Sequence, residues 1–180
     1  MKTELKLSDI RKKLPFHINY GLSAFRIADV IGDKTLDYEL DFDVFLPSKG
    51  INLQRPFVWT LLQKQQLIIS LLKGLEIPSM AFIHYEHKIF KVIDGKQRLN
   101  AWITFVQNEF PIIYNDQEYY FKDLDDWARG ELMFSKWVRA DVGYEYEDTP
   151  ISDDLKIQWF EMINFAGTPQ DIEHLKKLKS

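Results

Sequence analysis

The spacing of apolar residues changes at Asp94-Gly95, near the middle of the chain. Ile89–Ile93, directly before this dipeptide, is a short apolar run typical of a strand. After it, apolar residues recur at the spacing of one helical face, at Leu99, Trp102, Ile103 and Val106. Asp-Gly often forms a hairpin turn, but here the residues that follow have a helical and not a strand period. The sequence therefore predicts a strand that passes directly into a helix, with a glycine at the junction.

The other expected elements are short strands and helices in an order that is not a regular βαβ series. We expect strands over Tyr38–Leu46, Met80–His84 and residues 136–142, and a hairpin that joins residues 111–114 to 118–121. Helices are expected over residues 8–14, from Thr60 to Gly74, over Asp126–Phe134 and from Ser152 to Gly167. The second is expected to have an apolar face of Leu61, Leu62, Ile68, Ile69, Leu71 and Leu72, and the last to place Leu155, Trp159, Met162 and Ile163 inward. Thr60 and Gln63 match the pattern of a capping box. These elements predict an α+β domain with a short mixed sheet and flanking helices.

Composition restricts the class of protein further. At 180 residues, 46% of them hydrophobic, the chain has the size and composition of one globular domain. Cysteine is absent, which excludes disulfides and thiolate metal sites and is typical of a cytoplasmic protein. Charged residues interrupt the apolar stretches well before the roughly 20 residues that a membrane helix needs, so no membrane contact is expected. The net charge of −4 argues against strong non-specific DNA binding, so any DNA contact is expected to be weak and local.

The segment Asp94-Gly95-Lys96-Gln97-Arg98 carries the pattern of an anion site. Asp94 is expected to cap the helix, with Gln97 reaching back to it, while Gly95 leaves the backbone N–H groups open to close approach. Lys96 and Arg98 fall in the first helical turn, where the helix dipole disfavours each cation by roughly 0.3–1 kcal/mol. Two cations at this end predict a bound anion such as a phosphate. The alternative is that Arg98 pairs with a neighbouring carboxylate of the chain.

A second segment, Gln54-Arg55, precedes the helix that begins at Thr60 and lies in a loop fixed by Pro56. Arg55 is a candidate for a bidentate phosphate contact. The alternative is a surface arginine stacked on Trp59. A third segment, His84-Tyr85-Glu86-His87, lacks the further ligands that a metal site requires, so no metal site is expected there.

Three motifs then point to a family. The chain contains Leu-Gln-Arg-Pro-Phe-Val-Trp at 53–59, Val-Ile-Asp-Gly-Lys-Gln-Arg-Leu at 92–99 and Asn-Phe-Ala-Gly-Thr-Pro at 164–169. In this order they resemble the N-terminal domain of GmrSD-type restriction proteins, over residues 47–178. The resemblance divides the chain into an N-terminal extension, residues 1–46, with a candidate edge strand, and a ParB-like GmrSD N-terminal domain, residues 47–180.

What the resemblance implies is a ParB/sulfiredoxin-like domain that binds nucleoside triphosphates with Mg²⁺, and in some members slowly hydrolyses them, in phage defence. It implies catalytic roles for Asp94, Gln97 and Arg98. Asp94 would position Mg²⁺ or a water, and Gln97 would orient the attacking water. The implied nucleotide-binding residues are Gln54, Arg55, Gly95, Lys96, Asn164, Gly167 and Thr168. Lys96 replaces the first glutamine of the family's Asp-Gly-Gln-Gln-Arg motif, a change that puts hydrolysis in more doubt than binding.

Other functions remain open at this point. Related full-length proteins join this domain to a nuclease half with a His-rich metal site, and no such pattern follows Gln170. One alternative is therefore a non-catalytic regulatory subunit that senses a nucleotide or modified DNA and acts on a separate nuclease. Another is DNA cleavage by the ParB-like domain itself. The sequence leaves the oligomeric state and the preferred nucleotide undetermined.

Overall fold

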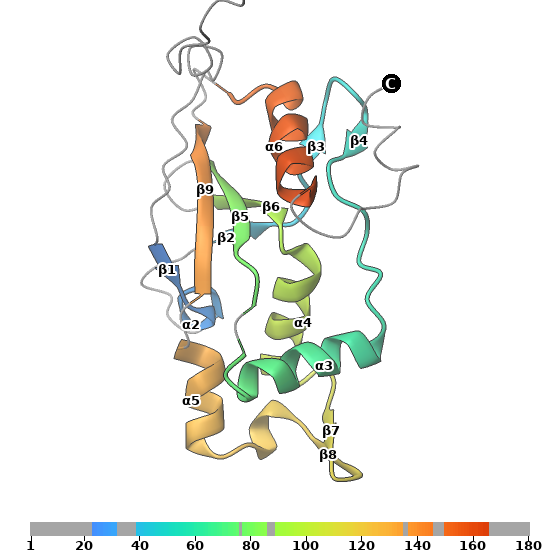
Figure 1. The fold of residues 1–180 in the computed structure, drawn as a ribbon, viewed down its shortest axis with the longest axis vertical. Helices are drawn as coiled ribbons and strands as arrows, with labels where there is room; N and C mark the ends of the chain where they lie inside the picture. Colours follow the sequence, from blue (N-terminus) through green and yellow to red (C-terminus); the bar gives the residue numbers. More distant parts are fainter. Residues whose placement is uncertain are drawn as a thin grey trace, which may run out of the picture.

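The structure is a computed structural model that describes residues 23–31, 39–75, 77–85, 89–134, 137–145 and 150–165. Within these ranges a five-stranded mixed sheet forms the centre of the molecule (Figure 1). Its order is β1 (Ser23–Phe25), β9 (Trp137–Glu145), β5 (Met80–Tyr85), β6 (Ile89–Asp94) and β2 (Glu39–Asp41). Strands β1 and β9, and likewise β5 and β6, are antiparallel, whereas β5 with β9 and β2 with β6 are parallel.

Helices cover both faces of this sheet. They are α2 (Ile27–Ile31), α3 (Leu61–Leu72), α4 (Lys96–Val106), α5 (Asp126–Phe134) and α6 (Asp153–Phe165), with a short 3-10 helix, η1 (Phe121–Asp123). Two small hairpins complete the described part, β3 (Phe45–Leu46) with β4 (Ile51–Asn52), and β7 (Ile112–Tyr114) with β8 (Gln117–Tyr119). The predicted α+β class with a short mixed sheet is confirmed.

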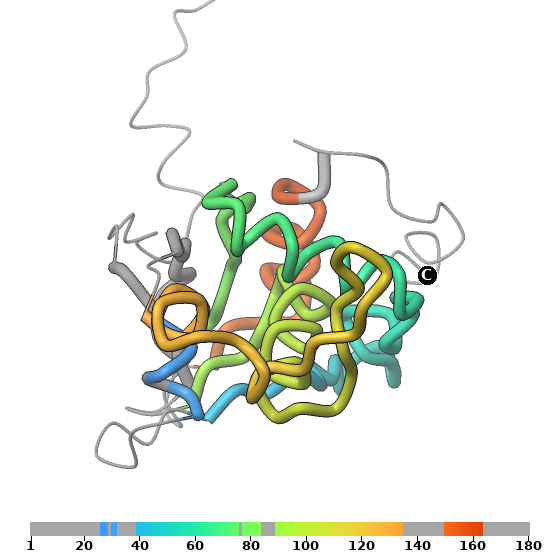
Figure 2. The backbone as a smooth tube through the Cα atoms, turned by 90° about the horizontal axis from the view of Figure 1, so that it is seen from below, coloured from blue at the N-terminus to red at the C-terminus, as the bar shows by residue number. Residues whose placement is uncertain are grey.

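The two faces of the sheet carry separate hydrophobic cores because strand side chains alternate in direction. Met80 and Phe82 of β5 pack with α3, α4 and α5 around Trp102. Ala81 and Ile83, the alternate residues of the same strand, pack in the second core with α6 and the β3–β4 hairpin. The view from below shows α5 beside α2 and the β7–β8 hairpin beside α3 (Figure 2). Helix α4 packs in the first of these cores, to which it contributes Leu99, Trp102 and Phe105.

The predicted strand Tyr38–Leu46 is wrong as a single element. Strand β2 ends at Asp41, and β3 begins at Phe45 in a separate hairpin. The break has a local cause, since Oδ1 of Asp41 accepts a hydrogen bond from the N–H of Asp43 at 2.8 Å. Short acidic side chains favour turns in this way, because they offer the backbone an alternative to the ladder of a sheet. The break turns Asp43 out of the sheet.

The predicted helices that fall within the described ranges lie where they were expected, but some of their apolar residues face solvent and not the core. Thr60 and Gln63 form the expected capping box on α3, and the predicted limits of α5 are those of the structure. Leu61, Leu62 and Met162, expected to face inward, are exposed. The expected helix at residues 8–14 and the expected end at Gly167 lie outside the described residues. None of the helices in the described ranges has the length and apolar content needed to cross a bilayer.

Candidate functional site

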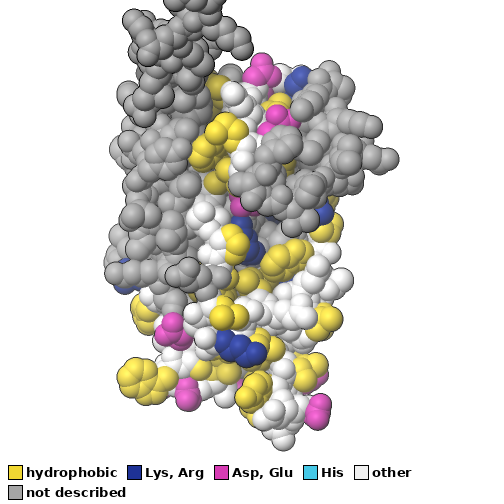
Figure 3. Space-filling view, in the orientation of Figure 1, with side chains coloured by type: hydrophobic (Ala, Val, Ile, Leu, Met, Phe, Trp, Pro, Cys, Tyr) yellow, Lys and Arg dark blue, Asp and Glu magenta, His cyan; other side chains and the backbone are white. Residues whose placement is uncertain are grey.

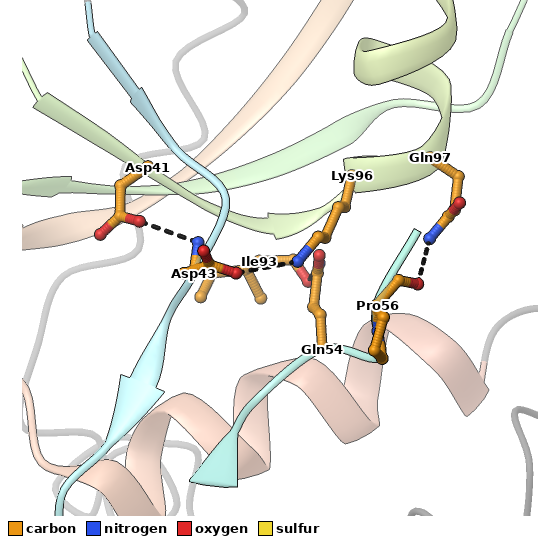
Figure 4. Close-up of polar contacts among 7 residues, drawn as sticks. All are labelled: Asp41, Asp43, Gln54, Pro56, Ile93, Lys96 and Gln97. Atoms are coloured by element: carbon orange, nitrogen blue, oxygen red, sulfur yellow. Dashed lines mark hydrogen bonds and ion pairs between the residues drawn. The ribbon is translucent and has the colours of Figure 1, made fainter. Parts of the chain in front are cut away.

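A pocket of about 150 Å³ lies where β6 ends and α4 begins. It is lined by Gln54, Arg55, Trp59, Asp94, Gly95, Lys96, Gln97, Arg98 and Phe160. The two segments that the sequence singled out, residues 54–59 and 94–98, thus meet in space (Figure 4). Asn164 belongs to α6, but its side chain lies outside the described part, as do Gly167 and Thr168 entirely.

The N-terminus of α4 has no side chain closing it, as far as the described residues show. Its N-cap is Gly95, in the left-handed conformation with φ 103°, so the prediction that Asp94 caps this helix is wrong. The first bond of the helix runs from the N–H of Leu99 to the carbonyl of Gly95. The N–H groups of Lys96, Gln97 and Arg98 find no partner within the described ranges. A helix start of this kind attracts anions.

Two features of position 95 favour glycine, namely its left-handed backbone and the lack of room for a side chain. A Cβ atom at this position would lie 2.7 Å from the sulfur and 2.8 Å from the Cγ of Met80, on the neighbouring strand β5. The absence of a side chain lets the start of α4 lie directly against the sheet.

Asp94 and Arg98 form an ion pair, with Oδ2 and NH2 separated by 2.7 Å. The guanidinium of Arg98 also donates to the carbonyls of Pro78 and Ser79. The sequence alternative, in which Arg98 pairs with a neighbouring carboxylate, is therefore what the structure shows. This pairing explains why Asp94 does not cap the helix, because the carboxylate is drawn to the arginine one turn further along. Both side chains still line the pocket.

The side chain of Lys96 extends from the start of α4 toward Asp43 (Figure 4). Its side chain is only 5% exposed, and its Nζ lies 3.2 Å from Oδ1 of Asp43 and 4.7 Å from the ring centroid of Phe57. Both cations of the first helical turn are thus paired with carboxylates of the chain. Arg55, in contrast, is exposed and makes no ion pair, hydrogen bond or ring contact with any described residue, so stacking on Trp59 is not observed. Arg55 is the cation most available to a ligand here.

Gln97 ties the two segments together. Its Oε1 accepts hydrogen bonds from the N–H groups of Val58 at 3.0 Å and Trp59 at 3.2 Å, and its Nε2 donates to the carbonyl of Pro56 at 2.9 Å. The expected reach of Gln97 back to Asp94 is therefore wrong. These bonds hold the loop that carries Arg55 against the open start of α4.

Gln54, an expected member of the site, lies deeper than its position in a loop predicts. Its side chain is 8% exposed, and its Nε2 donates to the carbonyl of Ile93. With the amide in this orientation, Oε1 is buried and has no hydrogen-bond partner in the described structure. A buried acceptor without a donor costs about 1–3 kcal/mol. The sequence offered a signal only for its place in the loop, and none for this unsatisfied oxygen.

Two further hollows are lined by described residues. A pocket of about 480 Å³ adjoins the first and shares Gln54, Arg55 and Lys96 with it. Its other walls are Asp43, Ile51, Asn52, Pro56 and Phe57. Sequence reasoning missed Asp43, which it placed on a strand. An apolar groove of about 710 Å³ lies far from both, between α3, α5 and the β7–β8 hairpin, at an end where the space-filling view shows several apolar side chains (Figure 3).

The described ranges hold no group of three histidine, cysteine or acidic side chains able to bind a metal ion by themselves. The side chains of residues 84–87 are outside the described part of the structure. Any metal held at the pocket would need ligands from a bound molecule in addition to the protein.

A family model described as the GmrSD restriction endonuclease, N-terminal domain, matches residues 43–177. The comparisons with curated proteins and with solved structures returned no match. The matched range contains the loop at 54–59 and the helix start at 94–98, which supply residues that line the pocket, and it also contains the motif at 164–169. The chain therefore belongs to the family of GmrSD restriction endonuclease N-terminal domains.

Proposed function

We propose that this domain, as a component of a restriction system, binds the phosphate groups of a nucleoside triphosphate at the start of α4. One observation carries the proposal. The N–H groups of Lys96, Gln97 and Arg98, unpartnered among the described residues, open a helix start beside the exposed Arg55. Backbone donors, the helix dipole and a guanidinium then all favour the same anionic guest.

The size of the pocket agrees with this ligand chemistry. Pockets for whole small molecules measure about 300–1,000 Å³. A volume of about 150 Å³ is below that range and suits phosphate groups better than a complete nucleotide. The ion pair of Asp94 and Arg98 keeps the pocket from being strongly positive without a ligand, so the affinity is expected to depend on Arg55 and the backbone donors.

The oxygen atoms at the pocket are compatible with Mg²⁺. This ion takes oxygen ligands and is usually held by one or two carboxylates together with substrate phosphates. Asp94 lines the pocket, and its Oδ1 makes no bond to any described residue, since Arg98 uses Oδ2. Asp94 would hold the ion or one of its waters, and the ion would neutralise charge on the phosphates.

Slow turnover, or binding alone, fits the geometry better than efficient hydrolysis. Gln97 was expected to orient an attacking water, but both lone pairs of its Oε1 already accept hydrogen bonds from the loop. We therefore assign Gln97 to positioning Arg55. This observation favours the second candidate function, a nucleotide-sensing regulatory subunit that acts on a separate nuclease.

Calorimetric titration of ATP, GTP, CTP and UTP with Mg²⁺ tests the proposal, with phosphate release measured in parallel. We expect wild type to bind at least one of them and Arg55→Ala to weaken that binding by roughly 10- to 150-fold, the range of a charged hydrogen bond. Lys73→Ala, which removes an exposed cation at the far end of α3, is the matched control and should leave affinity unchanged. Equal affinity of wild type and Arg55→Ala would overturn the proposal, as would binding of none of the four.

A further inference from the structure

The pocket of about 480 Å³ adjoins the proposed phosphate site along a shared wall of Gln54, Arg55 and Lys96. Lys96 shows the connection most directly, because its backbone N–H belongs to the start of α4 while its Nζ lies at Asp43 and Phe57, in the larger pocket. Taken together, the two pockets fall within the range of about 300–1,000 Å³ that whole ligands occupy. A ligand with a small anionic end and a larger remainder fits this pair of spaces.

The larger pocket offers a flat aromatic surface. Phe57 is 47% exposed, yet its ring is held in place by the Nζ of Lys96 and by an edge contact to Phe42, with the ring centroids 5.7 Å apart. An aromatic ring that is already fixed loses little conformational freedom when a planar group stacks on its free surface. Ile51 and Pro56 add apolar walls, and Asp43 and Asn52 add polar atoms. These surroundings suit a nucleobase.

The buried Oε1 of Gln54 lies in a residue that lines both pockets, and no described residue donates to it. In a nucleotide, the ribose lies between the base and the phosphates and carries hydroxyl donors. A ribose hydroxyl would satisfy this oxygen and remove the cost of leaving it unpaired. Gln54 belongs to the wall that a ligand spanning both pockets would contact, so its buried oxygen would meet a ribose hydroxyl there after a small movement of the side chain.

We propose that the nucleoside half of the ligand occupies the larger pocket, with the base against Phe57 and a ribose hydroxyl donating to Oε1 of Gln54. The inference rests on the proposed function, since it assumes that the phosphates bind at the start of α4. It adds that the site recognises a ribonucleotide as a whole and not a polyphosphate chain alone.

The test compares three kinds of probe by calorimetry: the four ribonucleoside triphosphates, their 2′,3′-dideoxy analogues, and inorganic tripolyphosphate, each with Mg²⁺. Wild type should bind its preferred nucleotide about 5- to 150-fold more tightly than tripolyphosphate, the range of stacking on an aromatic ring. The dideoxy analogue should bind about 2- to 10-fold more weakly than the ribonucleotide, because the hydrogen bond to Gln54 is lost. This comparison changes the ligand and not the protein, so folding does not affect it.

Phe57→Ala should lower affinity for the nucleotide toward that for tripolyphosphate and leave tripolyphosphate binding unchanged. Phe45→Ala removes another exposed phenylalanine, 53% exposed and outside both pockets, and should change neither. Equal wild-type affinities for nucleotide, dideoxy analogue and tripolyphosphate would overturn the inference and leave the phosphate site standing. An equal loss of nucleotide and tripolyphosphate binding in Phe57→Ala would also overturn it. If none of the three kinds of probe binds wild type, both the proposed phosphate site and this inference are wrong.

Discussion

Helices α3 and α4 have nearly the same length, 12 and 11 residues, but their N-termini are built in opposite ways. The start of α3 is closed by its own sequence, since Thr60 accepts from the N–H of Gln63 and the side chain of Gln63 accepts from the N–H of Thr60. The start of α4 has a left-handed glycine and no side-chain cap among the described residues. Closing a helix start stabilises the fold, whereas leaving it open keeps donors available to a ligand.

Each helix has a glutamine in its first turn, and the two glutamines have different hydrogen-bond partners. Gln63 bonds to its own N-cap, whereas Gln97 bonds to a separate loop about forty residues earlier in the chain. The second arrangement gives up local stability and brings Arg55 to the open N–H groups. The contrast teaches that the identity of a residue in the first turn says less about its role than what lies opposite it in space.

The largest expected effect is a loss of stability on replacing Gly95, at the start of α4, compared with replacing Gly74, at the end of α3. Gly95→Ala should lower the free energy of unfolding by about 2–4 kcal/mol, because it combines a left-handed backbone with a Cβ 2.7 Å from Met80. Gly74→Ala, at the end of α3, has φ 71° and open space around the added atom, so about 1 kcal/mol is expected. Urea denaturation measures both. Equal losses would show that α4 does not lie against β5 as described.

Gln97→Ala should weaken binding of tripolyphosphate by about tenfold, because the loop that carries Arg55 is no longer held at the helix start. Gln63→Ala, the corresponding change at α3, should leave that affinity unchanged while lowering stability. Calorimetry of the two variants side by side is the measurement. A loss of affinity in Gln63→Ala, or none in Gln97→Ala, would remove the functional difference between the two helix starts.

Thr60→Ala is expected to lower the free energy of unfolding by about 1 kcal/mol, since it removes the side chain that caps α3. Thermal or urea unfolding of the variant, with phosphate affinity as a second readout, checks this. Stability equal to that of wild type would mean that the capping box contributes nothing. Affinity should not change.

The smallest effect concerns the start of α6, where Asp153 accepts a hydrogen bond from the N–H of Ser48 at 2.9 Å. Burial by itself raises the pKa of Asp153, but hydrogen bonds from Ser48 and the charge of Lys156 outweigh burial and lower the pKa below its ordinary value of 3.8. A lowered pKa in the folded state stabilises at pH values above 3.8, and this stabilisation is lost as the pH falls through the lowered pKa. The stability difference between wild type and Asp153→Asn should therefore shrink below about pH 4. A difference that stays constant from pH 7 to pH 3 would contradict this.

The features of the fold that depend on residues close together in the sequence were predictable. The capping box of α3, the limits of α5 and the passage of β6 into α4 depend on neighbouring residues, and the structure has all three. The end of the strand at Asp41 was not predictable, because a side-chain hydrogen bond from the N–H of Asp43 to Asp41 interrupts a segment whose residues alternate between apolar and acidic. The pairing of β9 with both β1 and β5 joins segments far apart in sequence, and no pattern in either segment specifies it.

The candidate site was predictable in part of its membership and not in its contacts. Two of the three segments expected to form it line one pocket, and the side chains of the third, at 164–168, lie outside the described part. The partner of Lys96, Asp43, lies 53 residues away, so spacing along the chain could not reveal that this cation is already paired. The same holds for Gln97, whose partners lie in the other motif. Long-range contacts, which sequence spacing does not encode, determine which cation and which oxygen are left for a ligand.

The most direct test of the open helix start observes its N–H groups themselves. In a ¹⁵N-labelled protein, tripolyphosphate should shift the amide resonances of Lys96, Gln97 and Arg98 in a saturable manner. The amides of residues 61–63, at the closed start of α3, are the internal control and should stay in place. Unchanged resonances at 96–98, or equal shifts at both helix starts, would contradict the account.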